Sequence, residues 1–267
     1  MSEKSFLFVP GNRPERFDKA CAAGADAVIL DLEDAVAPTG KEAAREAVRQ
    51  WLQRGGRAWL RVNGTDTPWH EADLALLDLA GVLGVLLPKA EGTGELQALA
   101  QRMRTGTPLV PLVETAVGLW HARELASVPG VQRLAFGSVD FQVDLSIQGE
   151  GEELLFARSH LVLASRVAGL LPPVDGVTVA IDDDAMLQAD VARARRLGFG
   201  GKLCIHPRQV SAIQAGFRPS TADLEWARRV IEAAQGAGHD AVRLDGKLVD
   251  KPVIDRARAL LQEASST

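Results

Sequence analysis

Short apolar runs alternate along the chain with longer amphipathic stretches. Each run is almost continuously apolar, which is typical of parallel strands buried on both faces, and each stretch between runs has the periodicity of a helix. The runs predicted as strands are Phe6–Val9, Ala27–Leu30, Ala58–Val62, Val85–Leu87, Leu109–Val113, Leu134–Phe136, Val177–Ile181 and Lys202–Ile205. The stretches predicted as helices are Pro14–Ala23, Lys41–Arg54, Glu71–Leu79, Glu95–Arg104, Val117–Ser127, Glu152–Leu170 and Ala185–Leu197.

This alternation predicts an α/β fold built from repeated strand–helix units. Eight such strands favour a closed (β/α)8 TIM barrel, which we expect to occupy residues 1–215 as the catalytic domain. An open doubly wound sheet is the competing topology, and periodicity alone does not exclude it. The chain length of 267 residues is ordinary for a barrel of ~250 residues that carries an extension.

The pattern changes after His206-Pro207. A predicted helix, Thr221–Gln235, is followed by two short runs that flank Asp245-Gly246, a pair that suits the type I′ turn of a β-hairpin. A last helix is predicted over Pro252–Ala264. We therefore expect residues 216–267 to form a C-terminal helix-hairpin-helix lid.

Composition excludes several classes of protein. The net charge of −5 shows no basic excess, so nucleic acid and anionic membrane surfaces are not expected partners. No apolar run approaches the ~20 residues that span a bilayer. Cys21 and Cys204 lie far apart without a metal-ligand spacing, which argues against a disulfide framework or a zinc site. We expect a protein of the reducing cytoplasm.

Polar residues follow the predicted strands at the ends where barrel enzymes carry their chemistry. Asp31, Glu33 and Asp34 come after the second strand, and Lys89 comes after the fourth. Any one such residue is equally well explained as a helix cap or a solvated loop residue.

Two carboxylates on consecutive strands are harder to explain in that way. Glu114 follows the fifth strand and Asp140 follows the sixth, so the two would converge from two sides of a barrel mouth. Two carboxylates, with the remaining positions left to water and substrate, suit Mg²⁺. No cluster of His and Cys competes for a softer metal.

Arg61 lies among apolar residues on a predicted central strand, in Trp59-Leu60-Arg61-Val62-Asn63. A buried arginine needs a partner, so Arg61 either bridges the carboxylates after the second strand or binds an anionic substrate.

The chain resembles the citrate lyase beta-subunit and malyl-CoA lyase family in ordered segments along nearly its whole length. The opening Phe6–Arg13 carries this resemblance, together with the following segments: Ala27–Val36, Arg61–Asn63, Leu87–Ala90, Val113–Ala116, Phe136–Asp140, Gly198–Pro207 and Asp245–Pro252. Each segment is a weak signal, and their order along the chain makes the resemblance specific.

The resemblance implies a Mg²⁺-dependent barrel enzyme that cleaves or forms a carbon–carbon bond in coenzyme A thioesters of hydroxy acids such as citryl-, malyl- or citramalyl-CoA, with an acetyl-CoA-type product and a keto acid. By the same resemblance Glu114 and Asp140 are the metal ligands, and Arg61 and Glu114 bind the substrate. Glu33 and Asp34 resemble an acidic pair that orients Arg61 and metal-bound water. Asp250 resembles a catalytic carboxylate that the lid of a neighbouring subunit delivers, which implies a homotrimer or a multiple of one.

Three alternatives stay open at the level of sequence. A thioesterase would use the same scaffold with water as the reactant. A metal-dependent aldolase of free hydroxy-keto acids would need no coenzyme A and would leave the C-terminal hairpin unexplained. A non-catalytic subunit of a citrate lyase-type complex would carry a vestigial site, although Arg61, Glu114, Asp140 and Asp250 are all present.

Overall fold

The computed structural model describes residues 3–236 and 242–265. The chain divides into two compact units: the first ends at Gln214 and the second begins at Ala215.

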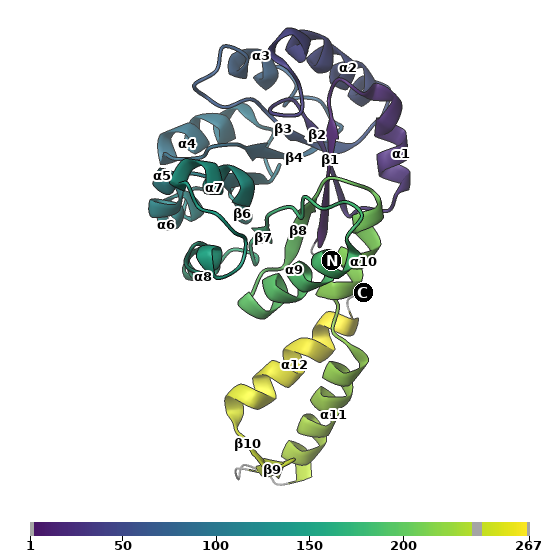
Figure 1. The fold of residues 1–267 in the computed structure, drawn as a ribbon, viewed down its shortest axis with the longest axis vertical. Helices are drawn as coiled ribbons and strands as arrows, with labels where there is room; N and C mark the ends of the chain where they lie inside the picture. The colour runs from purple at the N-terminus through teal and green to yellow at the C-terminus, as the bar shows by residue number, and fades with distance from the viewer. Residues whose placement is uncertain (1–2, 237–241, 266–267) are drawn as a thin grey trace. The chain divides into compact units, whose positions relative to one another are not determined.

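The first unit is a closed parallel barrel (Figure 1). Each strand pairs with the next along the chain, and β1 pairs with β8 to close the ring. The prediction of a (β/α)8 TIM barrel is thus confirmed, and the open doubly wound sheet is excluded. The strands are β1 Ser5–Pro10, β2 Ala27–Asp31, β3 Ala58–Arg61, β4 Val82–Leu87, β5 Leu109–Val113, β6 Ala135–Phe136, β7 Val174–Asp175 and β8 Gly201–Cys204.

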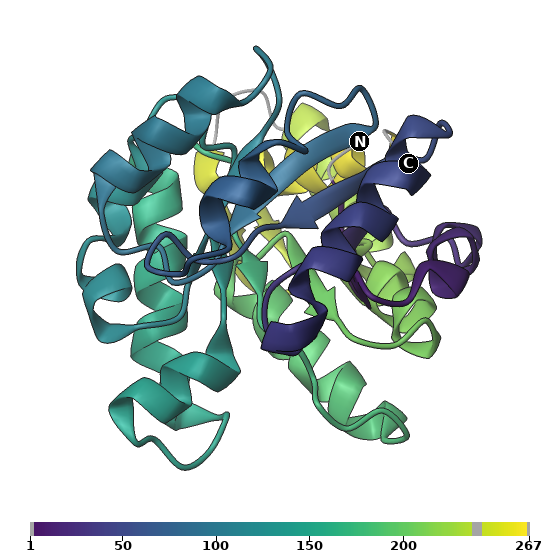
Figure 2. The ribbon, with the colours of Figure 1, turned by 90° about the horizontal axis from the view of Figure 1, so that it is seen from above.

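Helices lie outside this ring of strands, as both ribbon views show (Figure 1, Figure 2). The stretch predicted as one helix over Val117–Ser127 forms two short helices that meet at His121. The helices are α1 Phe17–Ala22, α2 Lys41–Gln53, α3 His70–Leu74, α4 Thr93–Arg102, α5 Ala116–Trp120, α6 Ala122–Ala126, α7 Ser138–Leu145, α8 Leu155–Val167, α9 Asp184–Leu197 and α10 Arg208–Phe217, with 3-10 turns at Pro14–Arg16, Pro38–Gly40 and Glu152–Leu154.

The seventh strand differs from the prediction. The run Val177–Ile181 is rich in β-branched residues but forms no strand, and the paired residues are Val174 and Asp175. The pairing of β7 with β8 ends at Asp175, and side chains bind Thr178 instead: its carbonyl accepts from Gln209 Nε2 at 2.9 Å, and its hydroxyl donates to Asp190 of α9 at 2.6 Å. Strand formation therefore follows the available backbone partners rather than local propensity.

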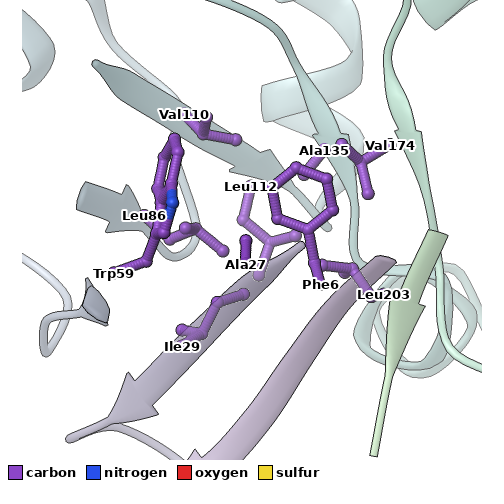
Figure 3. Packing of buried hydrophobic residues seen from close by; sticks show 10 residues of the cluster. All are labelled: Phe6, Ala27, Ile29, Trp59, Leu86, Val110, Leu112, Ala135, Val174 and Leu203. Atoms are coloured by element: carbon purple, nitrogen blue, oxygen red, sulfur yellow. The ribbon is translucent and has the colours of Figure 1, made fainter. Parts of the chain in front are cut away.

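The barrel interior is filled by side chains from all eight strands (Figure 3). Inward residues recur at every second position, as in the pair Ala27 and Ile29 of β2 and the pair Val110 and Leu112 of β5. The cluster comprises Phe6, Ala27, Ile29, Trp59, Leu86, Val110, Leu112, Ala135, Val174 and Leu203, with Phe8 and Val177 packed against it. The interior is a packed core and not a pore.

The second unit holds α11 Thr221–Gly236, the antiparallel pair β9 Val242–Leu244 and β10 Lys247–Val249, and α12 Lys251–Ser265. Asp245 and Gly246 both have positive φ, at 51° and 76°, as the predicted type I′ turn requires. The helices have an apolar cluster of their own around Ala227, Val230 and Ala257. In the described part of the chain no helix combines the length and the apolar character that crossing a membrane requires.

Gly84 gives a test of core packing. A β-carbon at this position of β4 would lie 2.3 Å from the Trp59 ring, whereas one at Gly94 of α4 would meet open space. We expect Gly84→Ala to lower the free energy of unfolding by about 1–3 kcal/mol, because overpacking displaces the ring. Gly94→Ala is the matched control and should leave that free energy unchanged or slightly higher. Chemical denaturation of both variants measures the difference, and equal stabilities would contradict this view of the core.

Candidate active site

A cavity of about 200 Å³ opens at the carboxyl ends of the barrel strands. Its floor is the top of the barrel core, formed by Phe8, Leu112 and Leu203 among others. Its polar wall contains Asp31, Asp34, Arg61, Glu114, Ser138 and Asp140. The carboxyl end of the strands is the end at which TIM-barrel enzymes carry their active sites.

Strand periodicity brings three of these polar residues to the mouth. Inward core residues lie two positions before each of them along the chain: Ile29 before Asp31, Trp59 before Arg61 and Leu112 before Glu114. Because the side-chain period of a strand is two, the polar residues continue the inward rows beyond the core.

Arg61 is held by a buried carboxylate on the neighbouring strand. Asp31 and Arg61 are directly paired in the β2–β3 ladder. The guanidinium donates from Nε to Asp31 Oδ1 at 2.7 Å and from the NH2 nitrogen to Oδ2 at 2.6 Å, a bidentate pair with 10% and 1% of the side chains exposed. It also lies 4.7 Å from the centre of the Phe8 ring.

A second carboxylate, Glu33, completes this arrangement. Its Oε2 lies 2.9 Å from the Arg61 NH1 nitrogen. Burial would lower the pKa of Arg61, but Asp31 and then Glu33 raise it above its ordinary value, so the guanidinium stays charged. The Asp31 carboxylate also accepts from the Glu33 N–H, and the buried Lys41 ammonium donates to the Glu33 carbonyl at 2.7 Å. The loop after β2 is therefore fixed from both sides.

The turn after β4 connects the Arg61 cluster to Glu114. Lys89 Nζ lies 3.2 Å from Glu33 Oε1, while the Lys89 N–H donates to Glu114 Oε1 at 2.7 Å. Burial lowers the pKa of Lys89, but Glu33, Asp34 and Glu114 together outweigh that effect, and the net pKa is raised.

Glu114 is poised to accept a cation. It is 1% exposed, and its Oε2 is buried without a hydrogen-bond partner in the described part of the chain. Burial, Asp140 and Glu33 together raise the pKa of Glu114 to about 8. The pKa of Asp140, in the first turn of α7, is also raised, by burial and by Asp34. Ionising either carboxyl group therefore costs free energy, and a bound cation would offset that cost.

The excess of negative charge at the mouth also favours binding of a cation. Five carboxylates (Asp31, Glu33, Asp34, Glu114 and Asp140) stand against three cations, Arg61, Lys89 and the buried Lys41. Within residues 3–236 and 242–265 no group of three or more His, Cys, Asp or Glu side chains is arranged to hold a metal ion. An ion at Glu114 and Asp140 would accordingly take its remaining ligands from water or substrate, as Mg²⁺ does.

The structure brings together Glu33, Asp34, Arg61, Glu114 and Asp140, as the sequence analysis expected of one site. It differs on how Arg61 is oriented: Asp31 and Glu33 contact the guanidinium, whereas Asp34 lines the pocket and is exposed. Of the two roles left open for Arg61, bridging carboxylates is the one observed. Asp31 is one of the carboxylates after the second strand that the sequence offers to Arg61, whereas the resemblance points to Glu33 and Asp34; its parity with Ile29 indicates an inward side chain.

Two further features of the site were not predicted. The short helix α7 was not expected, so Asp140 lies on a helix rather than in a loop. Lys41 was not singled out, although its side chain anchors the Glu33 loop.

Asp250 belongs to the second unit, where it directly precedes α12. Its side chain is exposed, and Oδ1 accepts from the Val253 N–H at 3.3 Å, which is the contact of a helix N-cap. The catalytic role expected of Asp250 stays a prediction.

Known proteins similar to this chain share its length and its barrel. The sequence profile of the HpcH/HpaI aldolase/citrate lyase family matches residues 4–207. A citrate lyase subunit beta-like protein from Deinococcus radiodurans is 38% identical, covering 97% of this chain and 96% of that protein. A (3S)-malyl-CoA thioesterase from Cereibacter sphaeroides is 35% identical, covering 98% and 95%. The crystal structure of CitE from Mycobacterium tuberculosis in complex with magnesium, acetoacetate and coenzyme A has a TM-score of 0.88 at 34% identity, covering 99% of this chain and 98% of that chain.

The raised pKa of Glu114 predicts a pH dependence of stability in chelator-treated protein. The folded state keeps this proton up to a pH of about 8, whereas an unfolded glutamate loses it near 4.5, so the free energy of unfolding falls as the pH rises between these values. Glu114→Gln lacks this titration. Between pH 5 and pH 8 the free energy of unfolding of wild type should therefore fall relative to that of Glu114→Gln. We expect this change to exceed ~1 kcal/mol, since one pKa unit is worth about 1.4 kcal/mol.

Urea denaturation at several pH values measures this difference. Glu42→Gln, at an exposed position of α2, is the matched control and should show a constant offset from wild type. A constant offset for Glu114→Gln as well would show that Glu114 is already ionised without a cation.

Proposed function

This chain belongs to the HpcH/HpaI aldolase/citrate lyase family, and from that premise we propose that it is a Mg²⁺-dependent carbon–carbon lyase acting on hydroxy-acid coenzyme A thioesters. The observation that carries the proposal is the pairing, in one pocket, of a buried bidentate Arg61 with a buried Glu114 oxygen that has no hydrogen-bond partner among the described residues. The CitE structures in complex with magnesium, and one also with coenzyme A, support the cofactor and the class of substrate.

Glu114 and Asp140 would hold the magnesium ion. Their chemistry fits, because both are hard oxygen ligands whose pKa values are raised in its absence. When bound, Mg²⁺ supplies Lewis-acid polarisation of the keto-acid oxygens.

Arg61 supplies the fixed positive charge of the site. Asp31 holds the edge of the guanidinium formed by Nε and Nη2, Glu33 lies against Nη1, and the group is part of the pocket wall. In carbon–carbon cleavage the hydroxyl of the substrate becomes a carbonyl, and negative charge develops on its oxygen as the proton leaves. A preorganised cation beside that oxygen stabilises the transition state without reorganisation.

A carboxylate must also move protons. Cleavage removes the proton of the hydroxyl, breaks the carbon–carbon bond, and leaves the electron pair on a thioester enolate, which then takes up a proton at carbon. Asp250, delivered by the second unit of a neighbouring copy, is our candidate for this group. The proposal therefore includes a closed homo-oligomer, a homotrimer or a multiple of one, in which each site is completed by the next chain.

Thioester hydrolysis is the second candidate, and the relatives named (3S)-malyl-CoA thioesterase favour it. A panel of purified hydroxyacyl-CoA thioesters, with and without Mg²⁺, separates the two reactions. A lyase releases a keto acid and no free thiol, whereas a thioesterase releases a free thiol and no keto acid. Absence of both products for every malyl-, citramalyl- and citryl-CoA substrate would overturn the proposed function.

The first prediction concerns the metal. We expect Glu114→Gln and Asp140→Asn each to weaken Mg²⁺ binding by at least ~10-fold, which is the effect of changing even a residue that only supports a ligand. Activity should fall with it. Asp144→Asn is the control: this exposed residue lies one turn further along α7, and its oxygen accepts from the Ala116 N–H. Isothermal titration measures binding, and full turnover of chelator-treated wild type would refute the metal site.

The second prediction concerns Arg61. We expect Arg61→Lys to lower kcat/KM at least ~10-fold, or ~1.4 kcal/mol of transition-state stabilisation, because an ammonium cannot reproduce the bidentate fork. Arg45→Lys is the matched control, since Arg45 pairs with buried Asp73 at 2.7 Å among residues that do not line the pocket. Steady-state kinetics of Arg61→Lys within twofold of wild type would assign Arg61 a purely structural role.

The third prediction concerns the shared site. Asp250→Asn removes the charge yet retains an N-cap residue, so it should be inactive and folded. After subunit exchange with an equal amount of inactive Arg61→Ala chains, activity should return to about a quarter of wild type, because about half of all sites keep Arg61 and about half of those receive an intact Asp250 in a closed ring. Mixing Arg61→Ala with Glu114→Gln is the control and should restore nothing, because every site then keeps one defect in its own pocket. Exchange without rescue in the first mixture would rule out a borrowed Asp250.

A further inference from the structure

Lys89 has a backbone conformation that lysine rarely adopts. Its φ is +47°, in the left-handed region, which the β-carbon of other residues disfavours sterically and which glycine adopts readily. The other described non-glycine residues with positive φ are Ser146, which caps the end of α7, and Asp245, in the hairpin turn. Lys89 instead lies at the active-site mouth, between strand β4 and the buried Ala90.

The left-handed turn determines what Glu114 presents to the pocket. It directs the Lys89 N–H at Glu114 Oε1, at 2.7 Å. The other oxygen, Oε2, is buried and makes no hydrogen bond in the described part of the chain. Glu114 packs so closely against Gly137 that a β-carbon there would lie 2.3 Å from Oε2. Oε1 thus accepts a backbone hydrogen bond from Lys89. Oε2 is held against Gly137 and has no hydrogen-bond partner among the described residues.

We propose that Lys89 is a positioning residue whose strained backbone orients Glu114 for metal binding through Oε2. This inference rests on the proposed function, because it takes Glu114 as a ligand of Mg²⁺. The Lys89 ammonium, 3.2 Å from Glu33 Oε1, ties the same turn to the carboxylate that contacts Arg61. A single turn therefore sets the relative position of the cation-binding and the Arg61-holding carboxylates.

Two substitutions isolate the backbone contribution. Lys89→Gly and Lys89→Val both remove the ammonium group, so any difference between them reports the backbone alone. Glycine adopts the left-handed conformation freely, whereas a β-branched residue strongly disfavours it. We expect Lys89→Val to bind Mg²⁺ at least ~10-fold more weakly than Lys89→Gly, in titrations of the full chain without substrate.

Stability controls separate positioning from a general loss of structure. Gly84→Ala perturbs the core far along β4 from the turn and should keep wild-type Mg²⁺ affinity, although it unfolds more readily. If Lys89→Val does not fold, Lys89→Ala replaces it. The β-carbon of alanine also disfavours the left-handed conformation, although less strongly than a β-branched side chain does. Equal Mg²⁺ affinities for the glycine variant and its β-carbon-bearing partner would overturn this inference and leave the proposed function standing. Unchanged Mg²⁺ binding in Glu114→Gln would instead overturn the metal site itself.

Discussion

A buried ion pair across two neighbouring strands organises the mouth of this barrel. Asp31 and Arg61 are partners in the β2–β3 ladder, so the register that pairs the backbones also pairs the charges. A guanidinium in this position would be costly alone, and removal of its carboxylate would leave an uncompensated buried charge. Glu33 extends the pair, Lys89 extends Glu33, and the Lys89 backbone reaches Glu114. Five residues of the site thus form one continuous chain of contacts, which runs from Asp31 through Arg61, Glu33 and Lys89 to Glu114.

The barrel and most of its candidate site could be predicted from the sequence, because both depend on local rules. Continuous apolar runs marked the parallel strands, and the polar residues after them marked the mouth. The seventh strand was misplaced because Val177–Ile181 has the composition of a strand but no backbone neighbours, which only the closed ring reveals. The resemblance assigns the partners of Arg61 to Glu33 and Asp34, whereas the inward parity of β2 identifies Asp31 as the residue whose side chain faces the guanidinium. The left-handed turn at Lys89 leaves no trace in residue type, since lysine is an unusual occupant of that conformation.

The site places mutually repelling carboxylates above a well-packed core. Burial, and then the neighbouring carboxylates, raise the pKa values of Glu33, Glu114 and Asp140, although the nearby cations lower them in part. This arrangement lowers the stability of the cation-free mouth, and the packed core beneath it offsets the loss. Functional sites in general combine locally unfavourable interactions, here repulsion between buried carboxylates, with a surrounding fold that is stable enough to tolerate them.

The floor of the pocket is also the top of the barrel core, since Phe8, Leu112 and Leu203 serve both. A change there alters the space for a substrate and the stability of the fold together. The rim is different, because Ala35, Val139 and Ile205 line the same pocket while remaining exposed to solvent. Substitutions at these three positions alter the shape of the entrance without opening a void in the interior. A change at the rim can therefore alter which substrate enters at little cost to folding, whereas a change at the floor alters both properties at once.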